Sequence, residues 1–216
     1  MYRKLYKYFP CPIDDNEACL DVLKKNTLKF SDVGAFNDPF DCRGVYDPDA
    51  WMVYAKDNGL LKKASNLSKL SASKRILQRR PMEYRLRSMI ESGMFHEEAI
   101  RSVGITCFSN KFDNILMWSH YASKHTGFLV EFTLDDEHAD ISLNDIEWFL
   151  QGFDVEYQID MPQISPPNHD DPFLSVKETF LYKAKDWEYE QEYRVISFKK
   201  GAGIHEFRSG PRWLDT

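Results

Sequence analysis

The stretch ILMWSHYASKHTGFLVEF, residues 115–132, joins a helical pattern to a strand-like one. Its first half carries apolar residues at helical spacing, Gly127 is placed to end the helix, and FLVEF continues as an apolar strand. Apolar residues surround most of the helical part, which is typical of a buried helix. The sequence therefore predicts a buried helix over residues 115–125 that leads through Gly127 into a strand.

Two histidines lie in this helical pattern. His120 and His125 are five residues apart, so on one helix they would point about 140° apart and could not both bind one metal ion. Two interpretations of His120 remain open. It is either a hydrogen-bonded core histidine or a residue that faces a cleft together with Tyr121.

Outward from this stretch, strand patterns occur towards both ends of the chain and helical patterns in the middle. Strands are expected in YKYF, LKFS, GITCFS, FLVEF, FDVEYQ and YRVISF. A short helix is expected near residues 16–27, another over 48–59, and helical segments to about residue 101, broken near Pro81 and Gly93. This arrangement predicts one α+β domain over residues 1–216, built on a mixed or antiparallel, possibly split, central sheet.

The overall composition excludes several classes of protein. The chain has 216 residues, and its 43% apolar share is enough for a packed core. No apolar window approaches the ~20 residues of a membrane span, and the N-terminal residues lack a signal peptide, so a cytoplasmic location is expected. The four cysteines have no zinc-site spacing, which favours reduced and mostly buried thiols. No glycine-rich phosphate loop follows the first strand.

A basic stretch lies within this acidic chain, whose net charge is −6. Between residues 62 and 87 only Glu83 opposes the basic residues, and residues 60–101 are predicted to form a helical, basic insertion. Such a stretch can bind phosphate backbones or pair with the acidic half of the chain. The candidate nucleic-acid-binding residues are Lys74, Arg75, Arg79 and Arg80.

A second cluster of charge lies in DWEYEQEYRVI, residues 186–196. Glu188, Glu190 and Glu192 alternate, so they share one face if the segment is extended, and Arg194 continues that face. One interpretation is an edge strand with a solvated face. The other places one glutamate in a cleft, where a carboxylate can accept a proton or stabilise a developing positive charge.

These segments together resemble one protein family. YKYFP, LKFSDVGAFNDPFDC, GITCFSN, ILMWSHYASKHTGFLVEF and WEYEQEYRVI occur in the order expected of the uncharacterised bacterial domain of unknown function 2971, from about Leu5 to Phe198. That family has no assigned reaction. Its members appear among mobile and defence-related genes, so the resemblance implies a part in defence or toxin-type conflict.

The order of elements also resembles the ADP-ribosyltransferase fold. That resemblance implies NAD as cofactor and a catalytic glutamate at the start of a late strand, here Glu192 or Glu190, with His120 beside it. The early-strand residue, usually His or Arg, would be Tyr6 or Tyr8. The remaining residues that the resemblance places around NAD are Phe36, Asn37, Asp38, Tyr121 and Arg194.

The leading prediction is therefore an NAD-dependent, ADP-ribosyltransferase-like enzyme that acts on an unknown macromolecule and needs no metal. One alternative is a nucleic-acid-interacting protein that uses the basic stretch without NAD chemistry. Another is a metal-dependent hydrolase with ligands from His120, His125, His169, Asp170 and Asp171. A binding or regulatory module without catalysis is the remaining alternative.

Overall fold

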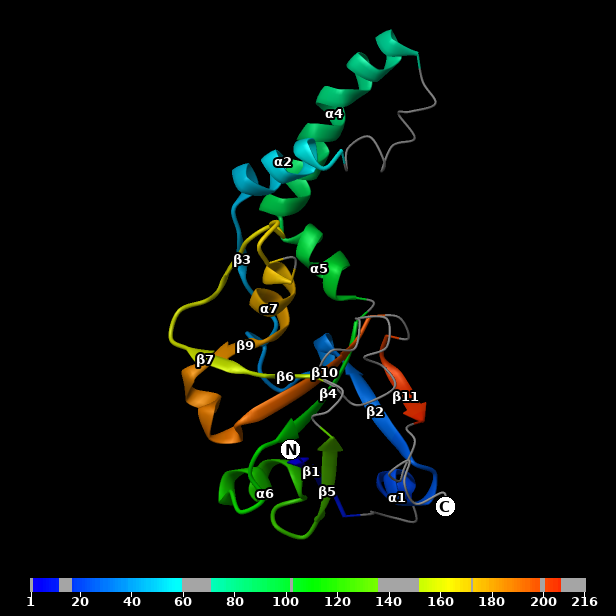
Figure 1. Cartoon of the computed structure of the whole chain (residues 1–216), viewed down its shortest axis with the longest axis vertical. Coiled ribbons are helices and arrows are strands. Elements are labelled where there is room, and N and C mark those ends of the chain that lie inside the picture. The colour runs from blue at the N-terminus through cyan, green and yellow to red at the C-terminus, as the bar shows by residue number, and fades with distance from the viewer. Residues whose placement is uncertain are drawn as a thin grey trace. The chain divides into compact units, whose positions relative to one another are not determined.

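A computed structural model describes residues 2–11, 17–59, 71–101, 103–135, 152–171, 173–198 and 201–206. The fold is α+β, as the sequence predicts (Figure 1). The chain divides into two compact units, each described by itself. The first contains residues 1–41, 102–159 and 183–216, and the second contains residues 42–101 and 160–182. This division does not test the prediction that residues 1–216 form a single domain, which stays a prediction.

An antiparallel sheet forms the first unit. Its path runs through β11 (Gly203–Glu206), β2 (Thr27–Asp32), β4 (Gly104–Ser109), β1 (Tyr2–Phe9) and β5 (Phe128–Asp135). Off this path, β10 (Glu192–Ser197) pairs with β4 and with β6 (Phe153–Asp154). The strands expected in YKYF, LKFS, GITCFS, FLVEF and YRVISF are all confirmed.

Strand β4 organises this sheet. Strand β10 pairs with β4 along its whole length, from Glu192 opposite Ser109 to Ser197 opposite Gly104. Strand β2 pairs with Gly104 and Ile105, whereas β1 pairs only with Ser109, at the other end of β4. Since β10 occupies one edge of β4, β2 and β1 share the other edge at opposite ends. The residues that follow Ser109 therefore leave the sheet close to where β10 begins.

The two faces of the sheet have different side chains. One face carries an apolar core that includes Leu5, Phe108, Phe132, Tyr193 and Val195. Because side chains alternate along a strand, the neighbours of Tyr193 in β10 point to the opposite face. That second face carries a small apolar cluster around Tyr8 and, from β10, two charged residues.

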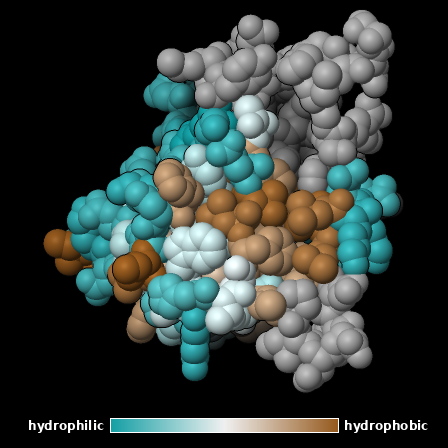
Figure 2. Space-filling model, turned by 90° about the horizontal axis from the view of Figure 1, so that it is seen from below, coloured by the Kyte–Doolittle hydropathy of each residue, from teal (hydrophilic) through white to brown (hydrophobic). Residues whose placement is uncertain are grey.

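The apolar residues of the first unit also reach the surface. Phe9, Phe128 and Val130 are only partly buried where they pack on the core, and the rings of Phe9 and Phe128 stack at 5.2 Å. Figure 2 shows one face of the molecule, on which apolar residues gather between hydrophilic ones.

Among the described residues, no helix has the length and apolarity needed to cross a membrane.

Helix α6 (Ile115–Tyr121) is shorter and more exposed than predicted. Asn114 caps its N-terminus, and the side chain of this residue accepts hydrogen bonds from the backbone N–H groups of Leu116 and Met117. The helix ends at Tyr121 because residues 123–125 have positive φ angles. Ile115 is 73% exposed, so the prediction of a helix buried all round was wrong.

Gly127 still explains how the chain passes from helix to strand. A Cβ atom at this position would lie 2.1 Å from the carbonyl oxygen of Phe9, so only glycine lets β5 approach β1 here.

Helices predominate in the second unit. It contains α2 (Pro48–Asp57), α4 (Ala72–Glu91), α5 (Met94–Ile100) and α7 (Leu174–Phe180), with the parallel pair β3 (Val45–Tyr46) and β8 (Gln163–Ile164). Asp47 caps α2, and the indole of Trp51 donates to the carbonyl of Ile164 over 2.8 Å. Of the predicted helical insertion 60–101, residues 60–70 lie outside the described residues.

Several sequence predictions need correction. Helix α4 runs through Pro81 without a break, so the predicted break was wrong. Pro81 has no backbone N–H group, and the carbonyl group four residues earlier therefore lacks its helical partner. Because this proline is exposed, that carbonyl group can face water. The expected break at Gly93 is confirmed, with φ of 78°. The predicted strand FDVEYQ is two strands, β6 and β7 (Glu156–Gln158), separated at Val155.

Short elements and cysteines complete the comparison with the sequence. The helix expected near residues 16–27 is a 3-10 turn, η1 (Glu17–Leu20), followed by α1 (Asp21–Lys24). A further 3-10 turn, η2 (Val33–Ala35), follows β2. Strands β3, β8 and β9 (Tyr182–Ala184) and helix α7 were not predicted.

All four cysteines are free thiols, but only Cys42 is buried, which corrects the expectation of mostly buried thiols.

Candidate functional site

The turn that enters β10 brings two glutamates together. Residues Lys185–Glu190 form a 3-10 helix, η6, and Gln191 then adopts a left-handed conformation with φ of 43° before β10 begins at Glu192. The segment is therefore not extended from residue 188, so the condition under which the three glutamates would share one face is not met. Glu188 is exposed, whereas Glu190 and Glu192 are 2% and 5% exposed.

Strand β4 fixes this turn through its last residue. The hydroxyl of Ser109 donates to the carbonyl oxygen of Glu190 over 2.6 Å, and the backbone N–H of Asn110 donates to the carbonyl of Gln191 over 2.8 Å. Strand β10 lies between β4 and β6, and all its residues are buried. The interpretation of this segment as a solvated edge strand was therefore wrong.

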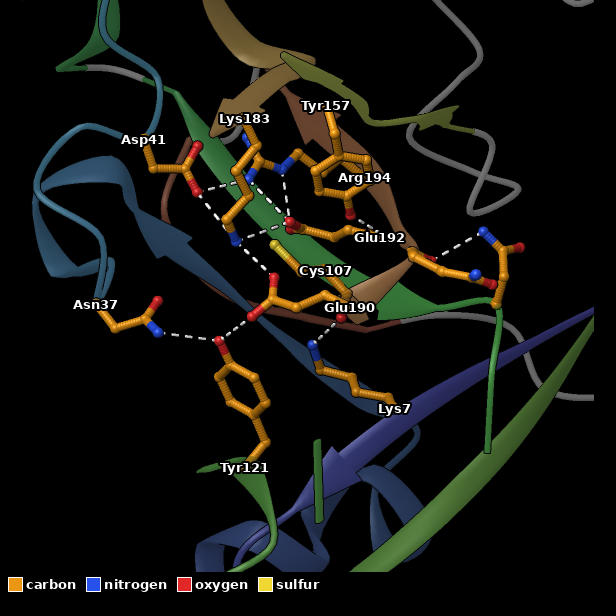
Figure 3. Close-up of polar contacts among 12 residues, drawn as sticks. Lys7, Asn37, Asp41, Cys107, Tyr121, Tyr157, Lys183, Glu190, Glu192 and Arg194 are labelled. Atoms are coloured by element: carbon orange, nitrogen blue, oxygen red, sulfur yellow. Dashed lines mark hydrogen bonds and ion pairs between the residues drawn. The ribbon is translucent and has the colours of Figure 1, made fainter. Parts of the chain in front are cut away.

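A buried group of charges surrounds the two glutamates on the second face of the sheet (Figure 3). We call it the carboxylate cluster, and it consists of Asp41, Lys183, Glu190, Glu192 and Arg194. All five residues belong to the first unit. Its three acids and two bases, each at most 5% exposed, come from the loop after η2 and from β9, η6 and β10.

Arg194 holds the deep end of the cluster. Its Nε and Nη2 atoms donate to the two carboxylate oxygens of Glu192 over 2.9 and 3.0 Å, and Nη2 also donates to Asp41 over 2.6 Å. The fork geometry of a guanidinium suits such a bidentate contact. Although burial opposes a charged carboxylate, Arg194 and Lys183 outweigh it and hold the pKa of Glu192 well below its usual value.

Lys183 lies between all three acids. Its ammonium is 2.5 Å from Glu190, 3.1 Å from Glu192 and 3.4 Å from Asp41. Burial alone would lower the pKa of Lys183, but the negative charges of these carboxylates outweigh burial and raise that pKa above its usual value. Lys183 is therefore a fixed positive charge at neutral pH.

Glu190 differs from Glu192 in its electrostatics. Burial is the largest influence on Glu190 and raises its pKa, and the negative charge of Glu192 adds to this effect. The ion pair with Lys183 opposes the shift without cancelling it. The carboxylate cluster thus contains Glu192, which is kept ionised, and Glu190, which binds its proton more tightly than an ordinary glutamate does.

A hydrogen-bonded chain connects Glu190 to the protein surface. The hydroxyl of Tyr121 donates to Glu190 Oε1 over 2.6 Å and accepts from the amide of Asn37 over 3.0 Å, and Asn37 is exposed (Figure 3). Burial, followed by the charge of Glu190, raises the pKa of Tyr121, so this phenol stays protonated. Next to it, the exposed ring of His120 lies 6.2 Å from the rings of Tyr121 and Tyr189.

Further groups surround the cluster without belonging to it. The backbone N–H of Glu192 donates to the hydroxyl of Tyr157 over 2.8 Å. The ammonium of Lys7 donates to the carbonyl of Cys107 over 2.7 Å, and burial lowers the pKa of Lys7. Burial and the charge of Glu192 raise the pKa of the Cys107 thiol, so this thiol is protonated and poorly nucleophilic.

The structure brings together many of the residues that the sequence singles out. Asn37, Tyr121, Glu190, Glu192 and Arg194 form one network of contacts, and the ring of Phe36 lies 5.5 Å from the guanidinium of Arg194. The core interpretation of His120 was wrong, because this histidine is exposed.

Other predicted site residues have different surroundings. The hydroxyl of Tyr8 donates to the carbonyl of Lys111, and the ring of Tyr6 packs against that of Phe112. Asp38 is buried, and one of its carboxylate oxygens accepts from the backbone N–H of Phe40.

Sequence reasoning missed two members of the cluster, Asp41 and Lys183. Asp41 lies in DVGAFNDPFDC, residues 32–42, a segment whose Asn, Asp and Pro residues are typical of a constrained turn, so a charge in that loop was a usable signal. Lys183 lies in a strand that was not predicted, and nothing near it in the sequence indicated burial.

In the described part of the chain, no three or more His, Cys, Asp or Glu side chains lie together so that they could hold a metal ion. The residues covered by this result include the ligands of the alternative hydrolase site, His120, His125, His169, Asp170 and Asp171.

A known protein family matches the segment that supplies most of the carboxylate cluster. Residues 117–195 match the model of a family of proteins of unknown function, DUF2971. The match confirms the resemblance over this segment. It contains Tyr121, Lys183, Glu190, Glu192 and Arg194, whereas the Asn37–Asp41 loop precedes it. No curated protein and no solved structure matches the chain significantly.

Proposed function

We propose that this protein is an ADP-ribosyltransferase-like enzyme that cleaves the nicotinamide–ribose bond of NAD, with Glu190 as the reacting carboxylate. The proposal is supported by the different contacts of two neighbouring glutamates in one buried cluster: Arg194 binds Glu192 through both carboxylate oxygens and holds it ionised, whereas Glu190 contacts Lys183 and Tyr121 and burial raises its pKa. Two titratable groups driven apart in this way are typical of sites in which one group exchanges a proton and the other stays charged.

The residues around Glu190 fit the nicotinamide riboside end of NAD. The ring of His120 lies next to the rings of Tyr121 and of Tyr189, and these aromatic rings offer surfaces for a planar ring. A carboxylate beside them can accept hydrogen bonds from ribose hydroxyls. Arg194 does not fit the pyrophosphate, because its guanidinium is fully buried and already bound to Glu192 and Asp41.

The chemistry needs one carboxylate near the sugar. When NAD is bound, its glycosidic bond breaks, the bonding electrons leave with nicotinamide, and the ribose carbon passes through an oxocarbenium-like state. The ionised Glu190 stabilises that positive charge and accepts the proton that the attacking acceptor loses as it bonds to the ribose carbon. A raised pKa favours this proton transfer, because a general base works best when its pKa approaches the working pH.

The other residues of the cluster position Glu190. Lys183 and Tyr121 donate to different oxygens of its carboxylate, which fixes the plane of the group. Glu192 keeps Lys183 and Arg194 in place. Asn37 orients the Tyr121 hydroxyl from the surface, so the Asn37–Tyr121 contact is where the substrate would approach Glu190.

Release of nicotinamide from NAD by the purified protein tests this proposal. NAD labelled in its adenosine part separates the two outcomes: label on added protein or nucleic acid indicates transfer, and free ADP-ribose indicates hydrolysis. We expect release with an apparent pKa above the usual glutamate value on the acidic side of the pH profile. Absence of release over the whole pH range in which the protein stays folded, with and without added acceptors, would contradict it.

A further inference from the structure

We propose that the outward face of α4 binds single-stranded nucleic acid, through phosphate contacts from Lys74, Arg80 and Arg85 and base stacking on Tyr84. This helix belongs to the second unit, and the proposal does not depend on NAD chemistry. It identifies the partner class and the residues that contact it.

The charge of α4 contrasts with that of the whole chain. Although the protein has a net charge of −6, the helix carries six basic residues against Glu83 and Glu91. Its basic residues are Lys74, Arg75, Arg79, Arg80, Arg85 and Arg87. The structure does not describe the side chain of Arg75.

Ion pairs divide these basic residues into two groups. Arg79 pairs with Glu83, and Arg87 pairs with Asp49 of α2 and with Glu91. Lys74, Arg80 and Arg85 are exposed and have no carboxylate partner among the residues that the structure describes. The described acidic residues therefore do not neutralise them, and an external anion can.

Apolar and aromatic residues lie on the same face as Lys74 and Arg80, whereas Arg85, five residues after Arg80, projects beside that face. Lys74, Leu77, Arg80 and Tyr84 are separated by three, three and four residues, which places them in one stripe along the helix. Leu77 is 74% exposed and Tyr84 is 75% exposed. These two exposed side chains, set among cations, give this face of α4 apolar and aromatic surface that a ligand can contact.

Single-stranded nucleic acid matches this combination best. Its unpaired bases can stack on an aromatic ring while neighbouring phosphates contact lysine and arginine. From Lys74 to Tyr84 the helix rises by about 15 Å, the length of roughly four stacked nucleotides of one strand. A duplex hides the faces of its bases, so it would use the cations without using Tyr84.

Binding of a fluorescent single-stranded oligothymidylate, measured by anisotropy at several salt concentrations, tests the proposal. With about three phosphate contacts, the slope of log affinity against log salt should be about −2. Changing Lys74 and Arg80 together to Glu should weaken binding strongly and reduce the slope to about −0.7. The matched control changes Lys29 and Lys111, exposed residues of the first unit, to Glu with the same change in net charge, and should bind as the wild type does.

Two variants of Tyr84 separate stacking from charge. Tyr84→Ala should weaken binding about tenfold, whereas Tyr84→Phe should keep wild-type affinity, because phenylalanine retains the ring. The proposal is overturned if the oligonucleotide does not bind at low salt or if the Lys29 and Lys111 control loses as much affinity. Equal or tighter binding of a duplex, or binding of anionic lipid vesicles without oligonucleotide binding, also overturns it.

Discussion

Replacement of Glu190 by glutamine lowers kcat for nicotinamide release by roughly 10²- to 10⁴-fold, the usual contribution of a positioned general base. The change keeps the shape of the side chain and removes only its ability to hold a negative charge or take up a proton. Lys183 keeps Glu192 and Asp41 as partners, so the fold should persist. Steady-state kinetics together with the circular dichroism spectrum would measure both effects.

The matched control for this variant is Glu188→Gln. Glu188 lies on the same 3-10 turn, but it is exposed, and its ion-pair partner among the described residues is Lys185 on the surface. The control removes one negative charge two residues from Glu190 without touching the cluster, so kcat should not change. Equal losses in the two variants, or full activity of Glu190→Gln, would show that Glu190 is not the reacting group.

Replacement of Arg194 by methionine lowers the free energy of unfolding by about 3–5 kcal/mol, the typical cost of leaving a buried charge without its partner. Arg194 is fully buried and binds both Glu192 and Asp41, so its loss removes a buried positive charge that two carboxylates share. Urea unfolding measures the change. Arg79→Met is the matched control and should cost less than about 1 kcal/mol, because Arg79 lies on the surface and its ion-pair partner in the described part of the chain is Glu83.

A double variant separates charge imbalance from lost packing. If uncompensated charge causes the destabilisation, Arg194→Met combined with Glu192→Met should be more stable than Arg194→Met alone. A loss of less than about 1 kcal/mol in Arg194→Met would contradict the view that this arginine holds the cluster together.

The strands were largely predictable because their alternation and apolar runs are local signals. Strands β1, β2, β4, β5 and β10, and the Asn114 cap of α6, follow from residues next to one another in the chain. Strands β3 and β8 have only two residues each, too few to produce a pattern, and their pairing joins positions more than a hundred residues apart. The same limit hid β9 and therefore Lys183.

The candidate site was predictable in its residue types but not in its geometry. The alternating glutamates of EYEQEYR marked the segment, and the asparagine-containing loop marked the other side of the site. Their relative positions depend on the left-handed Gln191, which rotates Glu190 away from the direction that an extended chain would give it. The opposite behaviour of Glu190 and Glu192 arises from Lys183, Arg194 and burial, none of which is visible in the spacing of the glutamates.

The pKa values of Glu190 and Glu192 are expected to depart in opposite directions from that of an ordinary glutamate. Carbon-13 NMR titration of protein labelled at its glutamate carboxyl groups tests it most directly, with the Glu190→Gln and Glu192→Gln variants used to assign the two signals. We expect the Glu190 carboxyl to titrate above the usual glutamate pKa, whereas Glu192 stays ionised to well below it. Titration of both groups at the usual pKa, or of Glu192 above Glu190, would contradict it.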